Sequence, residues 1–118
     1  MPPLREHFNP QVDATLAQTA EILTAEVAYL AAQTEIAFTE CVVQGRLQRR
    51  SLRAMPLALQ RRVIRQLLMQ QLQISPQFEQ VEKVVALLDA PNRRQSDPFP
   101  GGAIAVVDDP WIVLQPPL

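Results

Sequence analysis

The sequence predicts an α+β protein that is mostly helical and ends in a small β element. From Gln11 to Cys41 the chain contains no proline or glycine, and apolar residues recur there at helical spacing. Further on, Pro56 and Pro76 each open a stretch with the same period. Near the end, two β-branched runs flank Asp108-Asp109-Pro110. The predicted order is a long N-terminal helix, a helix pair and a C-terminal β-hairpin.

The long helix is expected from about Val12 to Phe38, with Asn9 as its N-cap and Pro10 in the first helical position. Two apolar lines run along it, one formed by Val12, Leu16, Thr19, Leu23, Val27 and Leu30, the other by Ile22, Tyr29 and Ile36. The rest of the chain is too small to cover such a helix on every side. We therefore expect a spine or connector that keeps an exposed apolar strip for a partner.

The middle of the chain predicts less regular structure and then a second helix. Residues 41–47 combine β-branched side chains with Gly45, which is typical of an irregular turn or short strand. Residues 46–56 are poorly periodic. Pro56 then starts a helix from Leu57 to about Leu72, whose apolar face comprises Leu59, Val63, Ile64, Leu67 and Leu68.

The third helix is expected to start at Ser75 as N-cap, with Pro76 in the first helical position, and to stop before Pro91. Its apolar stripe is Phe78, Val81, Val84, Val85 and Leu88. The hairpin strands follow at Ala103–Val107 and Trp111–Leu114. The predicted organisation is a connector helix (1–40) and a small helical domain ending in the hairpin (41–118), together one compact unit.

Composition excludes several classes of protein and of binding site. The chain has 118 residues, of which 47% are hydrophobic, but no apolar run approaches the roughly 20 residues of a membrane span. One cysteine, Cys41, excludes an internal disulfide and a Cys/His zinc site, and we expect it to be buried. No signal peptide is visible, so a cytoplasmic location is expected.

Charge is distributed unevenly along the chain. The net charge is −1, yet Glu6–Glu40 holds six acids and no Lys or Arg, whereas Cys41–Phe78 holds seven arginines and no acid. Arginine suits phosphate geometry better than lysine does, so the second stretch could present a local positive field to a polyanion. The alternative is that the acidic and basic stretches pack together and neutralise each other.

Catalytic patterns are missing. Gly101-Gly102 is followed by neither Lys-Ser/Thr nor a helix, and the adjacent Asp108 and Asp109 are typical turn formers. The sequence combines no nucleophile, base and anion-stabilising group, and it offers no metal or cofactor site. We expect a chain that is not catalytic on its own.

Several stretches resemble a known family. PLREHFNPQVDATLAQTAEILTAEVAYL is similar to the long helix that follows the catalytic domain of tRNA(Ile)-lysidine synthetases. MPLALQRRVIRQLL, FEQVEKVVALL and PGGAIAVV…WIVL resemble, in order, the substrate-binding domain that closes those enzymes. The resemblance covers essentially the whole chain.

The resemblance implies a tRNA-binding accessory domain of an ATP-dependent ligase that converts the wobble cytidine of an isoleucine tRNA to lysidine. ATP and lysine would be used by an N-terminal ATP-binding domain with an SGGxDS loop, which this sequence does not contain. That domain is expected to be a separate or removed partner. A protein-interaction module without nucleic-acid binding, including a homodimer through the long helix, is the alternative.

The arginines divide into two expected roles. Those predicted to bind the RNA backbone are Arg46, Arg49, Arg50, Arg53, Arg61 and Arg65. Arg62 is expected to form a structural ion pair with Glu79 or Glu82. Because aromatic residues are few, base stacking is expected to contribute little.

Overall fold

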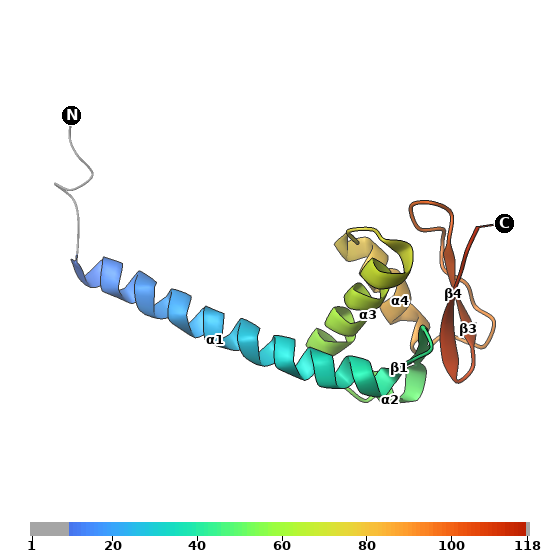
Figure 1. The fold of residues 1–118 in the computed structure, drawn as a ribbon, viewed down its shortest axis with the longest axis horizontal. Coiled ribbons are helices and arrows are strands. Elements are labelled where there is room, and N and C mark those ends of the chain that lie inside the picture. The colour runs from blue at the N-terminus through green and yellow to red at the C-terminus, as the bar shows by residue number, and fades with distance from the viewer. Residues whose placement is uncertain (1–9, 118) are drawn as a thin grey trace. The chain divides into compact units, whose positions relative to one another are not determined.

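The computed structural model describes residues 10–117, with side chains from Asp13 onward, so the predicted N-cap Asn9 lies outside the described part. The elements and their order confirm the α+β prediction (Figure 1). They are α1 (Pro10–Cys41), β1 (Val42–Val43), β2 (Arg46–Gln48), α2 (Arg49–Arg53), α3 (Leu57–Leu72), α4 (Phe78–Leu87), β3 (Ile104–Asp108) and β4 (Trp111–Gln115).

The chain divides into two compact units, Met1–Ala32 and Gln33–Leu118, with the boundary inside α1. In the first unit, apolar side chains of α1 are more than half exposed: Leu16, Ile22, Leu23, Val27 and Tyr29. The predicted exposed apolar strip is therefore present. The described residues contain no helix that is long and apolar enough to cross a membrane.

The second unit contains a four-stranded antiparallel sheet in the order β1-β2-β4-β3. β1 and β2 form a tight hairpin whose two turn residues, Gln44 and Gly45, have φ of 53° and 75°, as a type I′ turn requires. β2 joins this hairpin to the C-terminal one through the pair Leu47↔Ile112, and both of these side chains are buried. The predicted C-terminal hairpin is thus one half of a larger sheet.

α3 and α4 pack beside each other and are connected by an extended segment (Figure 1). α4 begins at Phe78, two residues later than predicted, so the expectation that Ser75 is its N-cap is wrong. Gln77 is the N-cap instead: its backbone N–H donates to Gln80 Oε1 at 2.7 Å, and the Gln80 N–H donates to the backbone carbonyl of Gln77 at 3.1 Å. This reciprocal pair satisfies two N-terminal amides, which Ser75 is too far upstream to reach.

The core of the second unit lies among the end of α1, the three later helices and the sheet. The predicted apolar faces supply it: Val63, Ile64, Leu67, Leu68, Val81, Val84 and Leu88 are all buried. Cys41 is also buried, as expected, and burial raises the pKa of its thiol, with a smaller contribution from the charge of Glu40.

Candidate nucleic-acid interface

Arg49, one of the arginines predicted to bind RNA, is held by partners inside the fold. Its side chain is only 7% exposed, and its Nη2 donates hydrogen bonds to the backbone carbonyl of Leu88, at 3.1 Å, and to that of Ala90. Nη1 donates to Asp109 Oδ1 at 3.3 Å. One guanidinium group thereby ties α2 to the end of α4 and to the β3–β4 turn.

The three neighbouring arginines differ in the number and kind of contacts that their guanidinium groups make. Arg53 donates to the carbonyl of Leu88 at 3.2 Å and pairs with Asp89 at 3.4 Å, although its side chain is 46% exposed. Arg46 lies over the ring of Trp111, 4.3 Å from its centroid. Arg50 is exposed. In residues 13–117, the guanidinium groups of Arg46 and Arg50 have no carboxylate partner.

On α3, the ion pair with α4 is formed by a different arginine from the one predicted. Arg61 Nε donates to Glu82 Oε1 at 2.8 Å, whereas Arg62 has no ion pair within the described part of the chain. Consecutive helical residues point about 100° apart, so only one of the two can face α4. The expectation that Arg62 pairs with Glu79 or Glu82 is therefore wrong.

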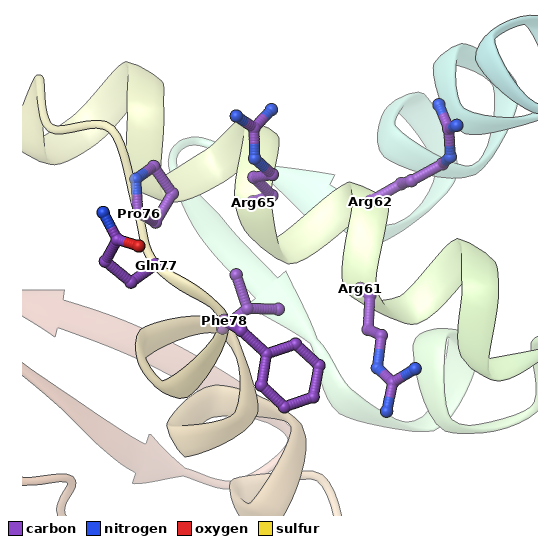
Figure 2. Close-up of a pocket in the computed structure, with 7 residues that line it drawn as sticks. Arg61, Arg62, Arg65, Pro76, Gln77 and Phe78 are labelled. Carbon is purple, nitrogen blue, oxygen red and sulfur yellow. The ribbon is translucent and has the colours of Figure 1, made fainter. Parts of the chain in front are cut away.

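Arg62 and Arg65 project from α3 in the same general direction, away from Arg61, as Figure 2 shows. Arg65 is exposed and Arg62 is half-buried. Among residues 13–117 no carboxylate pairs with Arg65 either. These two guanidinium groups therefore remain free to bind an anion from solvent.

A pocket of about 300 Å³ lies between α3 and α4, and Figure 2 shows its lining. Arg61, Arg62 and Arg65 line it from α3, and Pro76, Gln77, Phe78 and Val81 line it from α4 and the segment before it. The Phe78 ring is exposed, although the sequence pattern placed it in the core stripe. Phe78 occupies the first position of α4, where the stripe runs past the edge of the core.

Sequence reasoning also missed Trp111, which β4 places beneath Arg46. The useful signal would have been cross-strand pairing, because Trp111 stands opposite Gln48, two residues from Arg46.

No group of three or more His, Cys, Asp or Glu side chains in the described residues could hold a metal ion.

The second unit is a mostly helical body in which arginines line an apolar pocket. Comparison with known families gives its class: the model described as "TilS substrate binding domain" matches residues 47–107, from β2 into β3. The chain belongs to this family.

Curated relatives extend the likeness beyond the matched residues. The chain is 44% identical to a tRNA(Ile)-lysidine synthase of Nostoc sp., over 98% of its own length and 38% of the relative. It is 48% identical to one of Synechocystis sp. over 95% of the chain and 34% of the relative. It is 43% identical to one of Gloeobacter violaceus over 97% of the chain and 35% of the relative. The chain thus spans little more than a third of each of these relatives.

Proposed function

We propose that this chain is the tRNA-binding part of a tRNA(Ile)-lysidine synthase, holding an isoleucine tRNA while a catalytic domain modifies its wobble cytidine. The observation that carries the proposal is the family match at residues 47–107, which includes most of the arginine-rich stretch. In this proposal ATP and lysine bind to the catalytic domain, and the present chain contributes no reacting group.

The free cations support a contact with the RNA backbone. Within residues 41–78, Arg46, Arg50, Arg62 and Arg65 lack a carboxylate partner in the described part of the chain, whereas Arg49, Arg53 and Arg61 have one. Guanidinium groups of the first set can bind phosphate without first breaking an ion pair. Arg53 and Arg61 are partly exposed and could contribute at the cost of their pairs, but Arg49 could not.

The exposed apolar strip of α1 supports a second contact, with the catalytic domain itself. The relatives are much longer than this chain, so the family's proteins contain further sequence that this helix could pack against. Ile22, Tyr29 and Leu30 line an apolar hollow on α1 together with Ala25 and Glu26. We place the catalytic domain, rather than a second copy of this chain, against that surface.

Binding of a tRNA(Ile) transcript across a salt series tests the main proposal. If about four phosphates are contacted, log K should fall with log[salt] with a slope of about −3 to −4, so affinity drops about 100-fold between 50 and 200 mM salt. Arg50→Ala and Arg65→Ala should each weaken binding and reduce the slope by slightly less than about 1.

Lys83→Gln is the matched control, because it removes one positive charge from a residue that donates to the carbonyl of Pro98 and lies over Phe99. It should leave the salt slope unchanged. Binding that is insensitive to salt, or weakened equally by Lys83→Gln and Arg65→Ala, would contradict the proposed backbone contact.

A further inference from the structure

The pocket between α3 and α4 combines two features that a surface for duplex RNA does not need. Its wall includes an exposed aromatic ring, since Phe78 is 61% exposed, while Val81 beneath is only 5% exposed. Three arginines of α3 also line it, and of these Arg62 and Arg65 have no ion pair within the described residues (Figure 2). An apolar wall with guanidinium groups beside it matches a nucleotide, which has a flat base and a charged phosphate.

We propose that this pocket is a subsite for one unpaired RNA nucleotide, whose base stacks on Phe78 while Arg62 and Arg65 bind the adjoining phosphates. The inference rests on the proposed tRNA-binding function and deepens it, because it assigns part of the recognition to an unstacked nucleotide. It also revises the sequence-based expectation that stacking contributes little.

Size and shape support a single nucleotide. The pocket volume of about 300 Å³ lies at the low end of the range of about 300–1,000 Å³ that is typical of small-molecule sites. Phe78 is largely exposed at the start of α4, so its ring contributes little to the stability of the core. Such a ring is available to a base, since every base offers a π-face and stacking tolerates any sequence.

Electrostatics support the same arrangement. Arg61 lies 5.2 Å from the centroid of the Phe78 ring and is neutralised by Glu82, so it supports the ring rather than adding net charge. Glu79 is exposed in the first turn of α4 and disfavours phosphate close to it. The phosphates are therefore expected on the Arg62 and Arg65 side, which points away from Arg61 in Figure 2.

The test uses the full chain, a single-stranded oligoribonucleotide containing 2-aminopurine, and a blunt RNA duplex. Stacking on Phe78 should quench the 2-aminopurine fluorescence. Phe78→Leu should weaken binding of the single strand by about 5- to 150-fold, because a stacked base contributes on this scale. Duplex affinity should change less than about twofold, since a paired base is not available to stack.

Two further variants complete the design. Phe78→Tyr keeps an aromatic ring and should bind the single strand like the parent, whereas Phe78→Leu keeps only apolar bulk. Met69→Ala removes another exposed apolar side chain of α3 that does not line the pocket, and it should have no effect. Thermal melting of each variant confirms that the fold is retained.

The outcomes separate the two proposals. If the parent binds tRNA but Phe78→Leu leaves single-strand affinity unchanged, the subsite is refuted and tRNA binding stands. If the parent binds neither tRNA nor the single strand, the proposed function fails and the subsite fails with it. Equal losses for single-stranded and duplex RNA would also refute the subsite, because they would show a general effect on the surface.

Discussion

Replacing Arg49 by alanine should destabilise the fold by about 3 kcal/mol. Its two hydrogen bonds to the carbonyls of Leu88 and Ala90 come from a charged donor, and such bonds contribute about 1.5–3 kcal/mol each. Against this, Nε is buried without a hydrogen-bond partner among the described residues, so truncation also removes a desolvation cost of about 1–3 kcal/mol. Asp109 is 51% exposed and regains water, so losing its pair adds little.

Urea unfolding followed by circular dichroism measures this directly. With a typical m-value of about 1–3 kcal/mol/M, a loss of about 3 kcal/mol lowers the midpoint by about 1–3 M. Such a loss is a large fraction of the roughly 5–15 kcal/mol by which domains are stable. The neighbouring Arg50→Ala is the control, because an exposed side chain with no such contacts should change stability by less than about 0.5 kcal/mol.

Substitution of these two adjacent arginines should have opposite effects on stability and on tRNA affinity. Arg49→Ala should lose stability yet bind tRNA normally wherever it remains folded, whereas Arg50→Ala should lose affinity and keep its stability. The structural role of Arg49 would be refuted if its truncation cost less than about 1 kcal/mol, a value expected of one ordinary hydrogen bond. Equal destabilisation by both substitutions would refute it too.

Three other substitutions should change stability in defined directions. Gln73 ends α3 with φ of 54°, so Gln73→Gly should relieve left-handed strain and raise the melting temperature, by about 0.5–1 kcal/mol in stability. Leu47→Ala should cost about 2–5 kcal/mol in urea unfolding, because Leu47 is fully buried against β4. The raised pKa of Cys41 means that the folded state favours the neutral thiol. The stability that this thiol contributes is fully present below the unfolded-state pKa, near 9.0, and is lost as the pH rises through the folded-state pKa. Cys41→Ala should therefore show a shallower alkaline loss of stability above pH 9.0, measured by urea unfolding at several pH values.

Elements with strong local signals could be predicted closely from the sequence. The structure confirms α3 at Leu57–Leu72, because a proline fixed its start and a helical apolar period ran through it. The C-terminal strands, Ile104–Asp108 and Trp111–Gln115, lie within one residue of their predicted bounds. In both cases the residues that define the element are neighbours in sequence.

Pairing across the chain could not be predicted in the same way. The β1–β2 hairpin is very short, and its strand β2 finds its other partner in β4, far along the sequence. No local period specifies the register Leu47↔Ile112. The same applies to the arginines: Arg49 and Arg50 are chemically identical neighbours, and they are distinguished by partners far along the chain, the carbonyls of Leu88 and Ala90 and the carboxylate of Asp109.

The charges of α1 distinguish the surface proposed for RNA from the surface proposed for a protein partner. Every charged side chain described on α1 is acidic: Asp13, Glu21, Glu26, Glu35 and Glu40. Phosphates are repelled from such a helix, so its exposed apolar strip suits a protein partner better than RNA. Leu23→Ser and Val27→Ser, both at exposed positions, should therefore leave tRNA affinity within about twofold.

The same two variants should lose binding to the part of the Nostoc sp. synthase that lies outside its match to this chain, measured by co-purification. Size-exclusion chromatography with light scattering provides the control for self-association, which these substitutions would abolish if a second copy occupied the strip. If Leu23→Ser and Val27→Ser lost as much tRNA affinity as Arg65→Ala, the proposal that α1 faces protein rather than RNA would be refuted. Apolar side chains on an acidic helix would then contribute to RNA binding as much as a free guanidinium group does.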